Sequence, residues 1–238
     1  MAMDLHPDLK APWVPDIGVR FVPKAEKQAA EAFYHNLYEL QKWSDDFASS
    51  LALYDFARSQ PHGDFGPTNL MRRWSMMAAR NGGLALRNFC QCLAAARGVV
   101  GKVPFWEGKI DLKALKSIEA EFRDRFPDID KLRHAVAHPE FYANPSIDMT
   151  GAPKDMPGIS FGANITVQDA LGLGGTYATT INGMTVHYQL TIESAQLILD
   201  LARRAYAAVN QLTQEAAGNS DTSECPYEGD DGEVTSEA

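Results

Sequence analysis

Cysteine is scarce in this sequence, with three residues among 238, and such a count excludes a disulfide-rich scaffold. Cys90 and Cys92 lie two residues apart in a stretch with helical periodicity, which directs their side chains about 200° apart around the helix. That separation is poor geometry for a mutual disulfide or for a shared metal ion. We therefore expect both side chains to be buried small apolar groups, whereas Cys225 stands alone in a polar segment.

Long apolar runs are also missing. No stretch approaches the ~20 consecutive apolar residues of a membrane-spanning helix, so we expect no membrane partner. Residues 1–21 contain acidic residues and prolines where a secretory signal needs a basic start followed by an apolar run. These two absences predict a cytoplasmic protein.

Excess positive charge, which nucleic-acid-binding domains usually carry, is absent from the sequence as a whole. The formal net charge is −9. From Glu215 onward the sequence contains eight acidic residues and no Lys or Arg, so residues 1–214 alone carry a net charge of −1. We interpret 214–238 as an acidic disordered tail. A nearly neutral domain predicts that any contact with nucleic acid is local or is assembled across an oligomer.

The sequence does contain enough apolar material for one domain of medium size. Hydrophobic residues make up 45% of the chain, and a chain of this length buries roughly 70% of its unfolded surface on folding. Residues 1–23 contain four prolines and predict an extended N-terminal arm. Residues 24–213 form the predicted domain, which includes a loop and a β-hairpin insertion at about 140–190.

Three helices are predicted before the proline at 127. The first spans about 23–61, and its apolar seam repeats every three or four residues. The members of that seam are Phe33, Leu37, Leu40, Ser44, Phe47, Leu51 and Tyr54. The second helix spans about 68–97 and contains Gly82-Gly83, where we expect the close approach of another helix to offset about 1 kcal/mol per glycine. The third helix begins after Asp111, a favourable cap.

The pattern changes between residues 140 and 190, where Thr, Tyr, Val and Ile become frequent. Two segments, TYATTI and MTVHYQL, flank Asn182-Gly183, which is a strong signal for a two-residue hairpin turn. A last helix is predicted over 192–212. The expected fold is therefore mainly α: a four-helix up-down bundle with a small β-hairpin insertion before the last helix.

A short helix between Pro127 and Pro139 carries the residues that we interpret as the functional centre. On a helical wheel, one side of this helix is apolar and the other side presents polar groups around a small alanine. The polar side consists of Asp130, Arg133, His134 and His138 around Ala137. A hollow with an alanine floor and such a rim suits a small anion, although Arg and His on one helix face are also usual for a solvated surface.

These residue types favour phosphate as the anion. An arginine guanidinium binds phosphate oxygens with two hydrogen bonds and keeps its charge at any relevant pH. A histidine exchanges a proton near neutrality. Together, Arg133 and His138 could hold a phosphodiester and take a proton from an adjacent 2′-hydroxyl, which then attacks phosphorus. Such general acid–base help is worth about 10²–10⁴-fold in rate, and it needs no metal ion or cofactor.

The sequence around these residues resembles a known family. The run RHAVAH at 133–138 fits the Arg-x4-His motif of HEPN domains, in the form where a polar residue, here His134, follows the arginine. The flanking FRDRFPDIDKLRHAVAHPE and the upstream WSMMAARNGGLALRNF resemble an uncharacterised bacterial subgroup of that family. The resemblance covers roughly 24–140 and the last helix, and it leaves out the hairpin and the tail.

The resemblance implies a fold and an activity. HEPN proteins are helical bundles, often homodimeric, and many are metal-independent ribonucleases in which two copies of the motif form one cleft across the dimer. By that likeness Arg133 would orient and neutralise the phosphate, His138 would be the general base or acid, and His134 would hold the supporting polar position. Asp130 and, from the second helix, Arg80 would support the same cleft.

One departure from the family pattern narrows the resemblance. HEPN toxins that are silenced by adenylylation carry a tyrosine two residues after the motif histidine, but this sequence has Glu140 there. That mode of control is therefore not expected. A metal site is disfavoured as well: His134 and His138 have the spacing of two ligands, but Arg133 would place a second cation beside the metal.

Two functional hypotheses remain open. The first is a metal-independent endoribonuclease or RNA-binding protein that leaves 2′,3′-cyclic phosphate ends and serves bacterial defence or a toxin–antitoxin system. Its expected partners are a second copy of the chain, RNA, and an antitoxin or other protein. The second hypothesis is a non-catalytic helical dimer that binds a protein or nucleotide partner through the same cleft.

Overall fold

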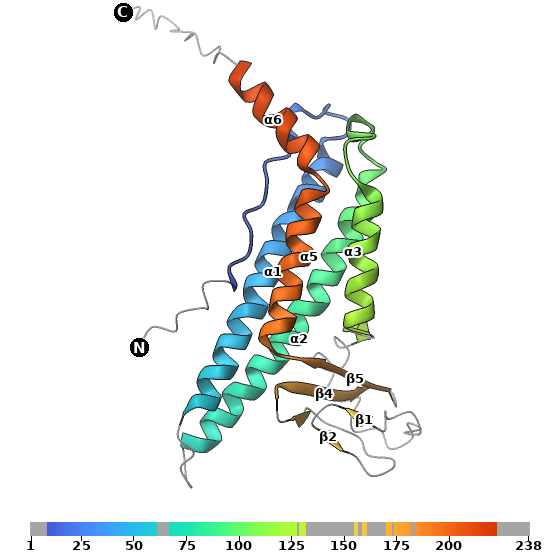
Figure 1. Cartoon of the computed structure of the whole chain (residues 1–238). Helices are drawn as coiled ribbons and strands as arrows, with labels where there is room; N and C mark the ends of the chain where they lie inside the picture. The colour runs from blue at the N-terminus through green and yellow to red at the C-terminus, as the bar shows by residue number, and fades with distance from the viewer. Residues whose placement is uncertain are drawn as a thin grey trace, which may run out of the picture.

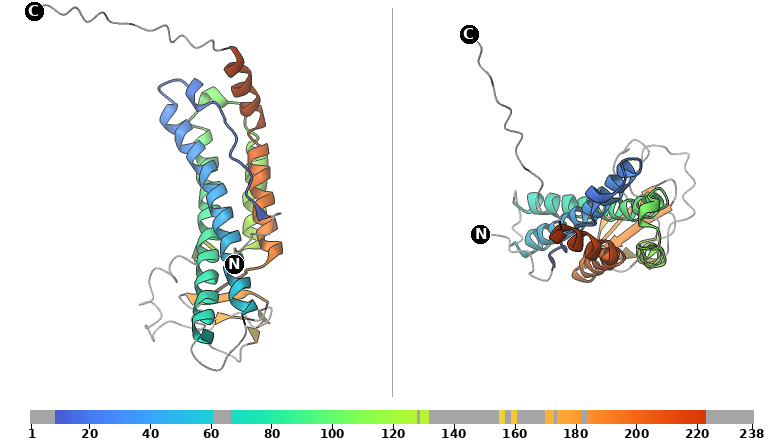
Figure 2. Two further views of the ribbon diagram at one scale, coloured as in Figure 1. Left: turned by 90° about the vertical axis from the view of Figure 1, so that its left-hand side faces the viewer. Right: turned by 90° about the horizontal axis from the view of Figure 1, so that it is seen from above.

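The computed structural model describes most of the chain, namely residues 9–60, 67–127, 129–131, 155–156, 159–160, 170–172, 174–181 and 184–222. This part of the chain is mainly helical and includes two small antiparallel sheets. Four long helices run side by side, and the sheets lie at one end of them (Figures 1 and 2). In the part of the chain that is described, no helix combines the length and the apolar character needed to cross a membrane.

The four long helices form a ring of neighbours. They are α1 (Lys27–Ser59), α2 (Pro67–Val100), α3 (Leu112–Arg125) and α5 (Ile192–Ala207). α1 packs against α2 and α5, and α3 also packs against α2 and α5. Each of these four helices overlaps one that the apolar pattern of the sequence predicted.

Two helix starts show how local chemistry sets the boundaries. α1 begins at Lys27 rather than at Pro23, because residues 23–26 form a turn in which the Glu26 amide donates to the Pro23 carbonyl at 2.9 Å. α3 begins after Asp111 as predicted, and the Asp111 carboxylate accepts a hydrogen bond from the Ala114 amide at 2.9 Å. That bond satisfies one of the amides that a helix leaves open at its start.

The core lies along the length of the helices. The predicted seam of α1 is buried in full, from Phe33 to Tyr54. Ring contacts join it to its neighbours: Phe33 meets Trp106 of the short 3₁₀ turn η3 (Pro104–Trp106) edge to face, with ring centroids 5.5 Å apart. Phe89 of α2 stacks on Phe122 of α3 at the same centroid distance. These ring contacts join α1 to η3 and α2 to α3.

The N-terminal arm packs against the helices. Residues 9–26 contain only one short 3₁₀ turn, η2 (Val19–Phe21), and the arm runs along the helices in Figure 2. Leu9 and Ile17 are buried, and the Ala11 amide donates to the Asp45 carboxylate of α1 at 3.3 Å. This segment is therefore part of the folded core.

The predicted hairpin is confirmed and gains one strand. β4 (Thr176–Ile181) pairs antiparallel with β5 (Met184–Gln189), and their last pair, Ile181 with Met184, leaves a two-residue connection. A short strand β3 (Ala170–Leu171) pairs with the other edge of β4. A separate pair, β1 (Asp155–Met156) and β2 (Ile159–Ser160), lies in the segment expected to be a loop. Two-residue strands carry no sequence periodicity that could predict them.

The close approach expected at Gly82-Gly83 is made by the sheet and not by another helix alone. A Cβ atom on Gly82 would lie 2.9 Å from the Tyr188 hydroxyl oxygen and 3.1 Å from Cδ1 of Leu190. Tyr188 belongs to β5, and Leu190 follows it. The expected helix neighbour is present as well, because Cε2 of Phe47 on α1 would lie 3.6 Å from the same Cβ, but the hairpin makes the two closer contacts.

The last helix is two helices. α5 ends at Ala207 and α6 (Asn210–Thr222) continues at an angle to it (Figure 1). Residues 214–222, which the composition assigned to the acidic tail, lie within α6. Ala216 is buried, its Cβ lies 3.1 Å from the Cβ position of Gly18, and Glu215 pairs with Lys109 at 2.7 Å. These distant partners stabilise a polar segment whose composition alone indicates disorder.

Candidate functional site at the junction of α2, α3 and β5

The predicted centre follows a point where three elements meet. After α3 the chain makes a 3₁₀ turn, η4 (Ile129–Lys131), which contacts both α2 and β5. Ile129 is buried, and its amide donates to the Phe126 carbonyl at 3.4 Å. The chain therefore enters residue 132 from a fixed position between α2, α3 and the hairpin.

A chain of ion pairs holds this junction. Arg97 of α2 and Arg123 of α3 both bind the Glu119 carboxylate, through their Nε atoms at 2.9 and 3.2 Å. Arg123 also reaches η4, where its Nη1 lies 2.5 Å from Oδ2 of Asp130. The hydrogen bond with Asp130 is the main reason that the pKa of Arg123 is raised above its usual value. The four groups join α2, α3 and η4 into one polar network.

Cys90 lies next to this network and is chemically quiet. Its side chain is buried and hydrogen-bonds to Asp130, and burial followed by the negative charge of Asp130 raises its pKa to about 12. A thiol with that pKa stays protonated near neutral pH, and a protonated thiol is a poor nucleophile. The expectation of a buried side chain is confirmed for Cys90, whereas Cys92 is only partly buried.

Arg87 is the residue of this region that sequence reasoning missed. It lies on α2, three residues before Cys90, and only 8% of it is exposed. Its Nη1 donates to the Asn88 side-chain oxygen at 3.0 Å. Arginine is seldom buried without a structural or functional reason. The available signal was the charge pattern of α2, which contains five arginines and no Asp or Glu.

A polar cavity of about 340 Å³ opens on the other side of the junction. It lies between the end of α3, strand β5 and the beginning of α5. Its lining residues are Asp124, Arg125, Phe126, Pro127, His187, Tyr188, Gln189, Ser194 and Leu197. Arg125 supplies a positive charge for an anion, and His187 supplies an imidazole with two ring nitrogens. Folding thus places the His187 imidazole of the hairpin in the same cavity as residues from the end of α3.

The structure reaches only part of the predicted site. Arg133, His134 and His138 lie outside the described residues, and so does most of the short helix predicted between Pro127 and Pro139. Asp130 is described, and it binds Arg123 and Cys90 as given above. The expected grouping of Asp130 with the two histidines stays a prediction.

Arg80 is not brought next to Asp130. It is exposed on α2, ten residues before Cys90, which corresponds to about 15 Å along the helix axis. Asp130 lies beside Cys90, whereas Arg80 lies elsewhere along α2. The two predicted supporting residues are therefore far apart. The next residue, Asn81, lines a groove between α1 and α2.

Metal binding has no support among the residues that can be placed. Within the described ranges no group of three or more His, Cys, Asp or Glu side chains is arranged to hold a metal ion. His134, His138 and Glu140, which formed the disfavoured metal alternative, lie outside those ranges.

Comparisons of this chain with protein-family models, with curated proteins and with solved structures find no match. The function must therefore be inferred from the chain itself.

Proposed function

We propose that this chain is a metal-independent RNA-cleaving protein of the HEPN type, in which Arg133 binds phosphate and His138 acts as general base or acid. The proposal includes a homodimer, with the two motif copies on either side of one cleft. Its biological setting would be bacterial defence or a toxin–antitoxin system in the cytoplasm, with an antitoxin as a possible protein partner. The four helices would then be the up-down bundle of that family.

The observation that carries the proposal is the surroundings of η4. The motif begins two residues after η4, and η4 is held by α2, α3 and β5. Arg97 of α2 and Arg123 of α3 belong to this junction, where they pair with Glu119 and Asp130, and Arg125 lines the neighbouring cavity. Cations gathered near the start of a predicted phosphate-binding segment favour an anionic substrate, although the whole chain carries a net charge of −9.

The chemistry follows from the residue types. Arg133 would bind the non-bridging oxygens of a phosphodiester with two parallel hydrogen bonds. His138 would take the proton of the neighbouring 2′-hydroxyl while the 2′-oxygen forms a bond to phosphorus. The bond from phosphorus to the 5′-oxygen then breaks, and that oxygen receives a proton from a protonated imidazole. The products are a 2′,3′-cyclic phosphate and a free 5′-hydroxyl.

The test uses the purified full chain with transfer RNA in excess chelator. We expect cleavage that leaves 2′,3′-cyclic phosphate ends, and its loss in His138→Ala and in Arg133→Ala. Matched controls are His35→Ala on α1 and Arg203→Ala on α5, both exposed and distant in sequence from the motif. The controls are expected to cleave like the parent chain.

Two results would overturn the proposal. One is intact RNA with the folded parent chain under these conditions. The other is cleavage that survives both His138→Ala and Arg133→Ala, which would mean that a contaminating nuclease or another site is responsible. Circular dichroism and a thermal melt of each variant separate lost chemistry from lost folding.

A further inference from the structure

Helix α2 concentrates positive charge in an acidic protein. Its 34 residues contain five arginines and no acidic residue, whereas the whole chain carries a net charge of −9. Arg72, Arg73 and Arg80 are exposed. Arg73 and Arg80 are seven residues apart, so they lie on the same side of the helix, about 10 Å apart along its axis. This side of α2 is suited to a polyanion.

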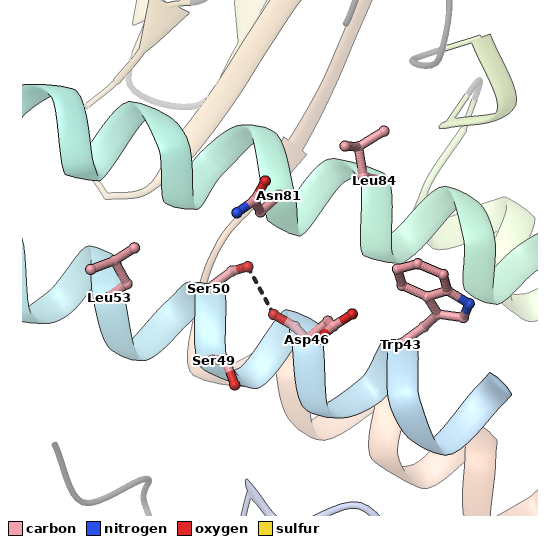
Figure 3. A pocket seen from close by; sticks show the side chains of 7 residues that line it. All are labelled: Trp43, Asp46, Ser49, Ser50, Leu53, Asn81 and Leu84. Atoms are coloured by element: carbon pink, nitrogen blue, oxygen red, sulfur yellow. Dashed lines mark hydrogen bonds between the residues drawn. The ribbon is translucent and has the colours of Figure 1, made fainter. Parts of the chain in front are cut away.

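A groove of about 370 Å³ runs between α1 and α2, and one of its lining residues is Asn81, which follows Arg80 in the sequence (Figure 3). Its lining residues are Trp43, Asp46, Ser49, Ser50, Leu53, Asn81 and Leu84. Trp43 closes one end, Leu53 lies toward the other, and Asn81 of α2 faces Ser50 of α1 across the middle. The volume suits a single nucleoside, and the mixture of one aromatic ring with polar groups is typical of small-ligand sites.

Trp43 is held in place by contacts on both helices. The indole lies close enough to the Cys92 thiol of α2 to oppose the rise in the pKa of that thiol, and the Lys42 ammonium lies 4.7 Å from the ring centroid. The side chain is half-buried, so part of the ring faces the groove. A fixed aromatic ring at the end of a groove is a platform on which a base can stack.

The polar groups of the groove select what stacks there. Ser50 is buried and its hydroxyl donates to the Asp46 backbone carbonyl at 2.8 Å, so it forms part of the floor. Asp46, Ser49 and Asn81 are exposed at the rim. A carboxylate only accepts hydrogen bonds, so Asp46 favours a ligand with N–H groups. Guanine presents two adjacent N–H donors on one edge, which matches the two oxygens of a carboxylate.

We propose that this groove binds one unpaired nucleotide of an RNA strand, with the base on Trp43 and the neighbouring phosphates against Arg73 and Arg80. Guanine is the preferred base because of Asp46. The identification of RNA as the polymer rests on the proposed function, but binding in the groove is measured without cleavage. The site is separate from the η4 junction, because Asn81 lies nine residues before Cys90 on α2.

A second copy of the chain is the other occupant to consider, because Met77 and Leu70 are exposed on α2. Two copies packed groove to groove would bury the Asp46 carboxylate and the Asn81 amide at the centre of an interface. Burying such groups without partners is unfavourable. Such a symmetric contact would also bring the arginines of both α2 helices onto one interface, where like charges repel.

The experiment measures binding of a labelled five-nucleotide single-stranded DNA that contains guanine, by fluorescence anisotropy with the full chain. This probe lacks the 2′-hydroxyl, so it stays intact whether or not the chain is a ribonuclease. We expect Trp43→Leu to weaken binding about ten-fold or more, as is usual for the loss of a stacking platform. Asn81→Ala and the pair Arg73→Ala with Arg80→Ala are expected to weaken it as well, and raised salt should do the same.

The controls are Trp13→Phe, at a tryptophan that is 88% exposed on the arm, and Arg203→Ala on α5. A probe with uracil in place of guanine should bind more weakly to the parent chain, and Asp46→Asn should reduce that difference. Equal binding by the parent chain, Trp43→Leu and Asn81→Ala would overturn the inference. A change of oligomeric mass in these variants without a change in probe binding would assign the groove to a second copy instead.

The two proposals fail separately. If probe binding depends on Trp43 but transfer RNA stays intact, the proposed nucleotide site is supported and the proposed ribonuclease activity is rejected. If cleavage depends on His138 but probe binding is unchanged in Trp43→Leu, the ribonuclease activity is supported and the proposed nucleotide site is rejected. Because Asn81 and Arg73 are exposed, their variants remain informative even if Trp43→Leu proves less stable.

Discussion

The hydroxyl of Tyr188 donates a hydrogen bond to the backbone carbonyl of Ala79, so the hairpin is bound directly to the backbone of α2. The ring is buried, and burial raises the pKa of the hydroxyl well above its usual value, which keeps the donor protonated. The backbone of Gly83 partly offsets that rise in the pKa. Ala79 and Gly83 are hydrogen-bonding partners in a regular α-helix. The Tyr188 hydroxyl therefore lies against the backbone hydrogen bonds of α2, beside Gly82.

Gly82→Ala is expected to destabilise the protein by about 1–3 kcal/mol, although alanine favours a helix by about 1 kcal/mol. The added methyl would stand 2.9 Å from the Tyr188 oxygen and 3.1 Å from Leu190. Gly98→Ala is the matched control on the same helix, because no atom lies within 4 Å of its Cβ position. That control should be neutral or slightly stabilising. Urea unfolding of the three proteins measures the difference.

A second substitution tests whether the Tyr188 hydroxyl is the cause. Tyr188→Phe removes the oxygen that the new methyl would meet, and it also loses a buried hydrogen bond worth about 1 kcal/mol. The double variant should therefore lose less stability than the sum of the two single variants. Strict additivity would show that the strain at Gly82 comes from Leu190 or from the backbone.

The N-terminal arm offers a contrast between two apolar residues four positions apart. Ile17 is 1% exposed and Trp13 is 88% exposed. Ile17→Ala is expected to lower the free energy of unfolding by about 2–4 kcal/mol, because it removes buried methyl groups and leaves a cavity. Trp13→Ala should change it by less than about 0.5 kcal/mol. Similar losses for both variants in thermal melts would mean that the arm is anchored differently.

Stability at alkaline pH should depend on the two cysteines of α2. Burial is the main cause that raises the pKa of Cys90 to about 12 and that of Cys92 to about 11, from 9.0 for a free thiol. Between pH 9 and those values the folded chain holds more protons than the unfolded chain, so stability falls as pH rises. Below pH 9 the contribution is complete.

The measurement compares the parent chain with the double variant Cys90→Ala and Cys92→Ala by urea unfolding at several pH values between about 8 and 11. The double variant is expected to be less stable at pH 8, because buried side chains are shortened, but to lose less stability as pH rises. Tyr188 and Tyr206 also have raised pKa values through burial, and they titrate alike in both proteins. Parallel curves for the two proteins would contradict the assignment.

The sequence predicted the elements whose apolar pattern is long. The seam from Phe33 to Tyr54 identified α1, and Asp111 marked the start of α3 through its own side chain. The hairpin was predictable because Asn182-Gly183 is a local signal. Each of these depends on residues within a few positions of each other.

The failures depend on contacts between distant residues. Gly82 contacts Tyr188 of β5, which lies more than one hundred positions later in the sequence. No local sequence pattern predicts such a contact. The segment 214–222 looks disordered by composition and is helical because Ala216 packs on Gly18 and Glu215 pairs with Lys109. For the site, the motif residues were visible in the sequence, whereas Arg87, His187 and the groove at Trp43 required the fold.

Asp130 provides a last prediction, which links the junction to the proposed activity. Its ion pair with Arg123 is exposed by 43% and 47% on the two side chains, so Asp130→Ala should cost less than about 1 kcal/mol of stability. Asp200→Ala is the matched control, since Asp200 pairs with Arg204 at 3.4 Å with similar exposure. Because η4 leads into the motif, Asp130→Ala is expected to lower kcat/KM for RNA cleavage at least ten-fold, whereas Asp200→Ala leaves it near the parent value. If the two variants cleave alike, Asp130 only stabilises the end of α3 and does not position Arg133.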